Sequence, residues 1–523
     1  MTLMRRRALL TGLPAVAAVR KPQPRPANLT ARNFTFAQAT SALTLDPAHG
    51  SFTLDPGATQ AALCLYDGLL GFDAAMRIVP LLASSYAMAP SLMSCRLKLR
   101  PHARFHDGSP VDAEAVKINL LRLMSTQRNP TNRELWDRLA AVETPDPTTV
   151  IIRTSAPYRD LPAALAHPSG GLVSPNAIET FGDTAIATNP IGAGPYRLTS
   201  FDQGRRVTLA AFEGYWGSRP KTTQIVLQTT VEPVDRNSFL RANTVQGIDG
   251  VSPALARDLA QMPGVTLVTA SGLRTLGFAI NMTRPALASQ KVRDALNLAT
   301  PVVEIATKLF LSHARAPDSP LAFNAIGHAS IGALAHDPTK AQALLAEPGH
   351  TPQRPLHLAM LTSEGLFPFD AQIAESVAVS LREVGVGVTV TKMKGNAYWD
   401  ALRQARANIR WDLALLGFSP ANASGLHQLT ALFRANIDDA TIPDAWNIGR
   451  YRNKEVDRLL QTAGATADET TFQAAMTKAQ ALIWQDAPAI WLPIAEHIVA
   501  TRSSVSGLEV SPSGFALLRH VVA

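Results

Sequence analysis

Residues 95–110, CRLKLRPHARFHDGSP, are the stretch that decides the fold. Apolar and charged side chains alternate along 95–100, and this period of two predicts a strand with one buried face. Asp107-Gly108 is typical of a tight turn. Asp112 then predicts an N-cap, followed by a helix that runs to Met124. A strand, a turn and a helix in immediate succession indicate a mixed α/β fold.

Working outward from this stretch, the same patterns predict alternating strands and helices, most regularly after residue 270. Strands are predicted at 34–37, 149–153, 207–211, 386–391, 412–417 and 490–498. Helices are predicted at 61–70, 291–298, 338–347, 367–384, 455–463 and 471–484. A chain of 523 residues is too long for one hydrophobic core, so we expect an α/β protein of two or three lobes.

The N-terminus has the pattern of an export signal. Arg5-Arg6-Arg7 precedes an apolar run at 8–19 that is too short to anchor the chain in a bilayer. Ala15-Val16-Ala17 offers small residues for cleavage. Residues 1–26 are therefore predicted to be a signal and linker, with the Sec and twin-arginine routes both open. We expect an exported, periplasmic protein.

The two cysteines leave two alternatives open. Neither Cys64 nor Cys95 lies beside the predicted signal, so no lipid-anchor cysteine is expected. In an oxidising compartment they could form one disulfide. Because Cys64 lies in an apolar helical run and Cys95 in the alternating strand, two buried free thiols are the other alternative.

Charge and motifs argue against nucleic-acid binding and catalysis. The formal net charge is +8, but the basic residues are scattered, with no dense run that carries aromatic residues. His106-Asp107 and His336-Asp337 fit turn and cap chemistry. His102 and His106 have the spacing of a zinc pair but lack its Glu. We therefore expect no enzyme activity, no metal site, no cofactor and no nucleic-acid partner.

Several blocks of the chain resemble the family 5 extracellular solute-binding proteins, which include dipeptide, oligopeptide, nickel-chelate, haem and glutathione binders. The blocks follow the family's order and span about residues 34–520. They are YDGLL at 66–70, PLLASSY at 80–86, LKLR through FHDGSP at 97–110, NPIGAGPY at 189–196, GYWG at 214–217, Asn281, KVRDALN at 291–297, DPTKA at 337–341 and RYRNKEVDRLL at 450–460. The chain looks most similar to the glutathione-binding branch.

This resemblance implies an α/β fold of the two-lobed periplasmic binding protein type, class II-like and large, with an extra subdomain. Lobe one is predicted at 27–272 and 489–523, with the subdomain inserted at about 60–188, and lobe two at 273–488. Two hinge strands, near 273–280 and 489–498, are expected to join the lobes. The ligand is expected in the cleft between the lobes, which close over it.

The function that the resemblance implies is that of the substrate-binding subunit of an ABC transporter. Such a subunit captures a peptide or peptide-like small solute, such as glutathione, and delivers it to the permease and ATPase subunits. A monomer is expected. Two alternatives stay open: a binder of a metal chelate or another non-peptide solute, and a periplasmic chaperone or hydrolase on the same scaffold.

The loop at 417–424 is the first candidate for ligand contact. In the peptide-binding members a similar loop offers an aromatic side chain and, three positions later, an Asp that holds the α-ammonium of the ligand. Phe418 matches the aromatic position, but Ala421 stands at the Asp position, and a buried ammonium without a carboxylate partner is costly. The predicted ligand-binding residues are Phe418, Ser419, Asn422, Ser424, Ser51, Phe52, Arg274, Trp446 and Arg450. Arg274 or Arg450 would suit a ligand carboxylate.

Overall fold

The computed structural model describes residues 33–52, 55–125, 133–182, 184–351, 353–404, 408–420, 422–435 and 446–523. All of them belong to one compact unit, 32–523. The predicted signal and linker at 1–26 and Ala421 lie outside the described residues. Within the described residues, every helix is too short or too polar to cross a membrane.

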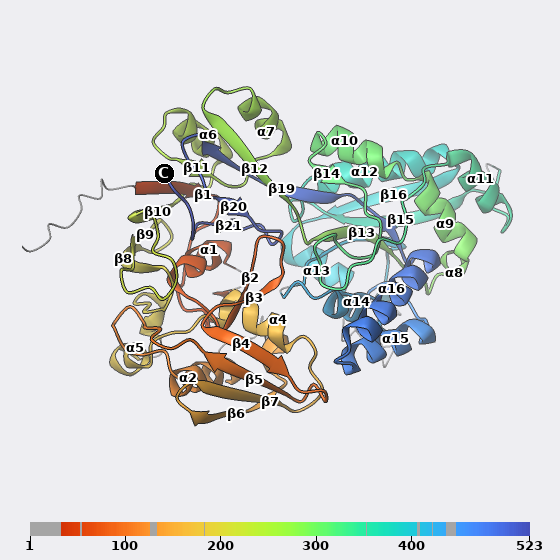
Figure 1. Cartoon of the computed structure of the whole chain (residues 1–523). Helices are drawn as coiled ribbons and strands as arrows, with labels where there is room; N and C mark the ends of the chain where they lie inside the picture. Colours follow the sequence, from red (N-terminus) through yellow and green to blue (C-terminus); the bar gives the residue numbers. More distant parts are fainter. Residues whose placement is uncertain are drawn as a thin grey trace, which may run out of the picture. The chain divides into compact units, whose positions relative to one another are not determined.

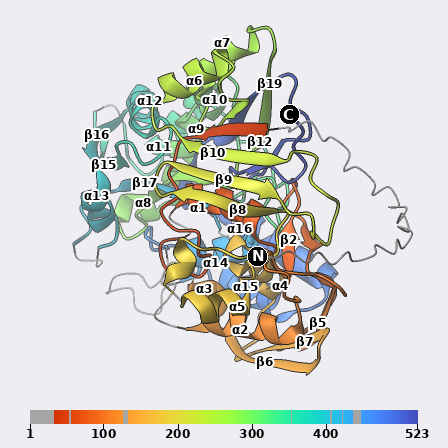
Figure 2. The same cartoon turned by 90° about the vertical axis from the view of Figure 1, so that its left-hand side faces the viewer.

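The largest sheet is mixed and has eight strands, in the order β12-β19-β11-β1-β10-β9-β8, with β14 beside β19. Figure 2 shows β1, β10, β9 and β8 side by side. The strands are β1 (Asn33–Gln38), β8 (Tyr196–Asp202), β9 (Arg206–Ala211), β10 (Gln224–Thr229), β11 (Gly247–Ile248), β12 (Val265–Ser271), β14 (Ala314–Arg315) and β19 (Ile494–Arg502). The helices nearby are α1 (Pro56–Leu65), α5 (Pro175–Phe181), α6 (Pro233–Arg241) and α7 (Pro253–Ala260). α7 packs on β12 and β19.

A second, antiparallel sheet has the order β4-β5-β7-β6 and carries the stretch at 95–110. Its strands are β4 (Ala83–Met88), β5 (Ser94–Leu99), β6 (Leu139–Asp146) and β7 (Thr149–Thr154). The elements around it are α2 (Ala113–Met124), α3 (Arg133–Trp136), α4 (Leu161–Ala166) and the hairpin β2 (Leu70–Phe72) and β3 (Ile78–Pro80). The predicted cap of α2 is confirmed, because the Asp112 carboxylate accepts a 2.9 Å hydrogen bond from the amide of Ala115.

A third sheet has five strands in the order β16-β15-β17-β13-β18. They are β13 (Thr275–Ile280), β15 (Leu356–Ser363), β16 (Val386–Met393), β17 (Leu413–Phe418) and β18 (Ala489–Trp491). The helices that follow or precede them are α8 (Pro285–Ala288), α9 (Gln290–Ala299), α10 (Val302–Phe310), α11 (Pro338–Ala346), α12 (Asp370–Glu383), α13 (Gly395–Leu402), α14 (Gly425–Phe433), α15 (Lys454–Ala465) and α16 (Glu469–Asp486). Figure 1 shows this group of elements in green to blue.

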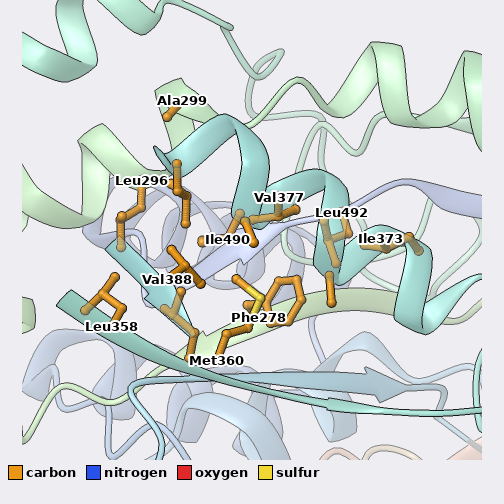
Figure 3. Close-up of a cluster of buried hydrophobic side chains, with 14 of the residues drawn as sticks. Phe278, Leu296, Ala299, Leu358, Met360, Ile373, Val377, Val388, Ile490 and Leu492 are labelled. Atoms are coloured by element: carbon orange, nitrogen blue, oxygen red, sulfur yellow. The ribbon is translucent and has the colours of Figure 1, made fainter. Parts of the chain in front are cut away.

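The core of the third sheet forms because α9 and α12 each present an apolar stripe. On α12, Ile373, Val377 and Leu381 recur at helical spacing, and all three are buried. Figure 3 shows Ile373 and Val377 facing Phe278 and Met360 of the sheet. The apolar face predicted for 291–298 is confirmed in α9, where it is also buried. These contacts hold β13 and β17 in place.

The chain changes sheet twice, at neighbouring points. It leaves β12 of the first sheet and enters β13 of the third through Gly272–Arg274, and it returns from β18 to β19 through Leu492-Pro493. The predicted single strand at 490–498 is therefore wrong, because it is divided between two sheets. The Gly272 amide donates a 2.9 Å hydrogen bond to the Ala495 carbonyl, which ties the two crossings together.

The helix predicted at 61–70 begins and ends earlier than expected. Asp55 caps it at Ala58, and Pro56 occupies the first turn, where its missing amide costs nothing. The backbone of Tyr66 is extended, and the next residue but one after Leu65, Asp67, is held by groups from distant segments. Tyr215 and Trp216 donate to Asp67 Oδ2 at 2.9 and 2.7 Å, and Arg519 donates to Oδ1 at 2.5 Å.

The sequence blocks at 97–110 and 189–196 meet at His106. The Gly192 amide donates to His106 Nδ1 at 3.2 Å, so Nε2 carries the proton and donates to the Gly194 carbonyl at 3.1 Å. Both glycines are needed for close approach, since a Cβ at Gly192 would lie 2.1 Å from the Leu65 carbonyl oxygen. Cys64 and Cys95 are both free and buried. Of the two alternatives, a disulfide or two buried free thiols, the structure therefore has the free thiols.

Candidate functional site

The predicted loop after β17 begins at the end of a buried strand. Phe418 is half-buried beside the ring of His427, with the ring centroids 6.1 Å apart, and Ser419 is exposed. Asn422 and Ser424 are both buried and stabilise the start of α14. Asn422 Oδ1 accepts from the Ser424 amide at 3.2 Å, and Ser424 Oγ accepts from the His427 amide at 3.0 Å as the N-cap.

Two of the predicted residues line the same small apolar cavity of about 50 Å³. Phe418 and Trp446 both line it, together with Trp491 and Phe433. It lies beside β13 and β18, close to where the chain crosses between the sheets. The cavity is too small for a tripeptide, because pockets for drug-sized ligands measure about 300–1,000 Å³.

A second cavity of about 650 Å³ lies between α3–α4 on one side and α14–α15 on the other, and we call it the α4–α14 cavity. The following residues line it: Glu134, Leu135, Asp137, Arg138, Pro157, Tyr158, Arg159, Asp160, Asn422, Leu426, His427, Thr430, Arg434, Ala435, Asp457, Leu460, Gln461, Gly464 and Ala465. Its size is that of a small-molecule site. Asn422 is the predicted ligand-binding residue that lines it.

Charges of both signs face the α4–α14 cavity. The carboxylates come from Glu134, Asp137, Asp160 and Asp457, and the guanidinium groups from Arg138, Arg159 and Arg434. Within the described residues, Arg138 and Arg434 have no salt-bridge partner. A cavity with charges of both signs suits a zwitterionic solute, whose charged groups would replace lost hydration with protein partners.

Asp160 is the carboxylate that connects the two walls of this cavity. Its Oδ2 accepts a 2.6 Å hydrogen bond from Ser424 Oγ. Burial raises the pKa of Asp160, although Ser424 and the nearby positive charges of His427, Arg159 and Arg138 act in the other direction. Beside it, burial and the charge of Asp160 raise the pKa of Tyr158.

Arg159 makes the other contacts between the walls. Its guanidinium donates to the Thr466 carbonyl at 2.7 Å and pairs with Glu469. It also lies 3.8 Å from the centroid of the Phe472 ring on α16. Arg159 therefore fastens the start of α4 to the α15–α16 pair.

The remaining predicted residues lie apart from the α4–α14 cavity. Ser51 is exposed and hydrogen-bonds His49, whereas Phe52 is fully buried in the core beneath the first sheet. Arg450 is buried at a φ of 58° and donates to the Gln404 carbonyl at 3.0 Å.

Arg274 is the predicted cation with the most freedom to meet a ligand. It is exposed at the first chain crossing, where its guanidinium lies 5.7 Å from the centroid of the Phe367 ring. Among the described residues it has no hydrogen bond or ion pair. Partial desolvation lowers its pKa, and its charge helps to lower the pKa of His497.

Sequence patterns do not indicate that α3 and α4 form one wall of a cavity. Asp160-Leu161-Pro162 has the pattern of a helix start, and that pattern explains the residues without any ligand. Only tertiary structure brings Asp160 to Ser424, which lies far along the chain. As for metals, the part of the chain that the structure describes contains no group of three His, Cys, Asp or Glu side chains placed to hold an ion.

Solved structures share this fold. HbpA2 from Haemophilus parasuis superposes with a TM-score of 0.84 at 21% identity, covering 94% of this chain and 99% of that one. The substrate-binding protein CtaP from Listeria monocytogenes gives 0.82 at 21% identity, with 94% and 99% covered. The periplasmic binding protein DppA from Helicobacter pylori, in complex with the peptide STSA, gives 0.72 at 21% identity, with 94% and 98% covered.

Glutathione-binding proteins are similar in sequence over almost the whole length of this chain. The glutathione-binding protein GsiB of Pectobacterium atrosepticum is 28% identical over 517 residues, which cover 98% of this chain and 97% of the relative. GsiB of Salmonella paratyphi A is 27% identical over 496 residues, covering 93% and 94%. The model of the bacterial extracellular solute-binding proteins, family 5, matches residues 77–439. The predicted two-lobed fold and transport-binding role are thereby confirmed, and the chain belongs to the bacterial extracellular solute-binding proteins, family 5.

Proposed function

We propose that this chain captures a small peptide-like solute of the glutathione class in the periplasm and passes it, chemically unchanged, to an ABC permease and its ATPase subunits. The observation that carries the ligand class is the 28% identity to a glutathione-binding protein across 98% of the chain. The predicted export signal and a monomeric state are part of the same proposal.

The α4–α14 cavity supports a zwitterionic ligand of this size. Glutathione carries one ammonium and two carboxylates, and the cavity offers carboxylates together with the guanidinium groups of Arg138 and Arg434. Planar guanidinium groups bind carboxylates through two parallel hydrogen bonds, so they give orientation as well as affinity. Among the predicted residues, Asn422 lines this cavity and Ser424 bonds Asp160 beside it, so these two are proposed as its ligand contacts. Phe418, Ser419, Trp446 and Arg274 lie outside its lining.

Capture would follow from the difference in contacts between two conformations. A solute that touches both walls of the cavity stabilises the form in which the walls are close, by the free energy of those additional contacts. Closing the walls also removes water and strengthens each polar contact to the solute. The permease would then recognise the closed form, which the solute makes more abundant.

The direct test is ligand-dependent stability of the purified mature protein. Reduced glutathione, glutathione disulfide, trialanine and nickel–histidine are added separately, and unfolding is followed by calorimetry. A ligand present at a hundred times its Kd stabilises the native state by roughly 2.7 kcal/mol. Stabilisation by glutathione or trialanine is expected.

Three outcomes would count against the proposal. No stabilisation by glutathione or trialanine overturns the peptide-like ligand class, and stabilisation by nickel–histidine alone favours the metal-chelate alternative. Recovery of glutathione cleaved into shorter fragments after long incubation, measured by mass spectrometry, would indicate a hydrolase.

A further inference from the structure

Asp160 occupies a helix-capping position without capping its helix. It is the N-cap residue of α4, yet its side chain makes no hydrogen bond to the first turn. Aspartates at the same position of other helices do cap, with 2.7–2.9 Å bonds: Asp55 on α1, Asp112 on α2, Asp337 on α11 and Asp468 on α16. A capping bond stabilises the helix start, so α4 forgoes stability that its sequence offers.

The carboxylate is directed across the cavity instead. Oδ2 accepts the 2.6 Å bond from Ser424, and Oδ1 accepts no hydrogen bond from any described residue. Asp160 lines the α4–α14 cavity together with Asn422 and His427. One oxygen is thus held in position, while the other remains available inside a cavity of about 650 Å³.

The nearby cations form no ion pair with Asp160. Arg159 is occupied by Thr466 and Glu469, and Arg138 donates to the Pro157 carbonyl at 3.2 Å and lies over the Tyr158 ring. Within the described residues, Asp160 forms no salt bridge. The charges of His427, Arg159 and Arg138 act on Asp160 from a distance and offset its burial only in part, so a ligand cation in direct contact would offset the remaining desolvation cost.

We propose that Asp160 binds the ammonium group of the solute in the α4–α14 cavity, with Ser424 holding the carboxylate in place. The inference rests on the proposed function and assigns one charged group of the ligand to one residue. Because Asp160 and Ser424 stand on opposite walls, the ammonium would meet both walls only when they are close. Asp160 would therefore contribute to ligand selection and to closure together.

The test compares Asp160→Asn with wild type by calorimetric titration, using glutathione and N-acetylglutathione, which lacks the ammonium charge. The amide keeps an oxygen for Ser424 but removes the negative charge. Hydrogen bonds to charged groups are worth about 1.5–3 kcal/mol, so glutathione affinity should fall roughly 10- to 100-fold in Asp160→Asn. Wild type should lose a similar factor for N-acetylglutathione, and the variant should show little further loss. Trialanine and N-acetyltrialanine are titrated in parallel.

Asp258→Asn, on the exposed surface of α7, is the matched control and should bind as wild type does. Equal glutathione affinity of Asp160→Asn and wild type would overturn the inference while leaving the proposed function intact. The inference would also be overturned if Asp160→Asn lost affinity by the same factor for the free and the N-acetylated form of each peptide, because that pattern indicates a structural role. Wild type that binds none of the four compounds would overturn the proposed function and this inference with it.

Discussion

At the scale of single residues, His106 shows how burial selects a protonation state. The Gly192 amide donates to Nδ1 and the Gly194 carbonyl accepts from Nε2, so only the neutral ring satisfies both partners. Burial lowers the pKa of His106 from 6.5 to about 4. Burial also lowers the pKa values of His167 and His497 to about 4. Burial therefore favours the neutral form of all three rings in the native state.

The pH dependence of stability follows from the direction of these shifts. Between about pH 6.5 and 4 these histidines bind protons in the unfolded chain but stay neutral in the native state. The free energy of unfolding therefore falls as the pH falls through this window. Each such histidine costs about 2 kcal/mol at pH 5 relative to pH 7. Asp249, whose pKa burial raises to about 6, acts in the opposite direction.

His106→Gln isolates one of these contributions, because a glutamine amide can accept from one glycine and donate to the other. We expect its stability to change less between pH 7 and pH 5 than that of wild type, by about 2 kcal/mol, measured by urea unfolding at both pH values. An unchanged difference between the two pH values would show that His106 titrates normally in the native state.

At the scale of elements, Asp67 is the residue on which distant segments converge. Its buried carboxylate joins the extended chain after α1, the aromatic pair Tyr215-Trp216 and the C-terminal Arg519. Burial and the charge of Asp67 raise the pKa of Tyr215, so the phenol remains protonated as a donor. Without the carboxylate, the donors would lose their common acceptor and Arg519 its counter-ion.

We therefore expect Asp67→Ala to destabilise the protein by about 3 kcal/mol or more, because breaking a buried ion pair leaves one charge without a partner. Chemical unfolding monitored by circular dichroism measures the loss. Asp202→Asn, on the exposed end of β8, serves as the control and should change stability by less than about 0.5 kcal/mol. A loss below 1 kcal/mol in Asp67→Ala would show that the network is not cooperative.

At the scale of the whole molecule, Arg159 provides the contacts that connect α4 with the α15–α16 pair. A guanidinium can serve the Thr466 carbonyl and the Glu469 carboxylate at once while it lies over the Phe472 ring. An ammonium cannot reproduce this combination. The arginine contacts therefore favour conformations in which the two walls of the α4–α14 cavity are close.

Arg159→Lys keeps the positive charge but removes this geometry. If the lost contacts are worth about 1 kcal/mol and the open and closed forms are about equally populated in the ligand-free wild type, the closed population falls and the apparent Kd for glutathione rises roughly threefold. The radius of gyration of the ligand-free protein, measured by small-angle X-ray scattering, should increase and should return to the wild-type value at saturating ligand. A weaker affinity without any change in the ligand-free radius would instead indicate that Arg159 contacts the solute directly.

Much of the fold could be predicted from local patterns. The alternation at 95–100, the Asp112 cap and the apolar stripe of α9 depend on neighbours within a few residues, and each is confirmed. The prediction of one final strand at 490–498 is wrong, because the continuous apolar run does not reveal the point where the chain moves from one sheet to another. Periodicity reports which side of an element is buried, but it does not report which sheet buries it.

The candidate site also contains residues that the sequence could predict and one that it could not. The loop residues Phe418, Asn422 and Ser424 could be selected from the sequence, since they follow a predicted strand in a loop that resembles the ligand-contacting loop of the peptide-binding members. Asp160 could not, because its local pattern is that of an ordinary helix cap, and only the 2.6 Å contact with Ser424 shows that the carboxylate faces a cavity. The sequence by itself determined the family, the order of the elements and the scaffold blocks, all of which depend on local chemistry. The tertiary structure alone decided which polar groups meet across the cavity, because the contact between Asp160 and Ser424 joins segments that are distant along the chain.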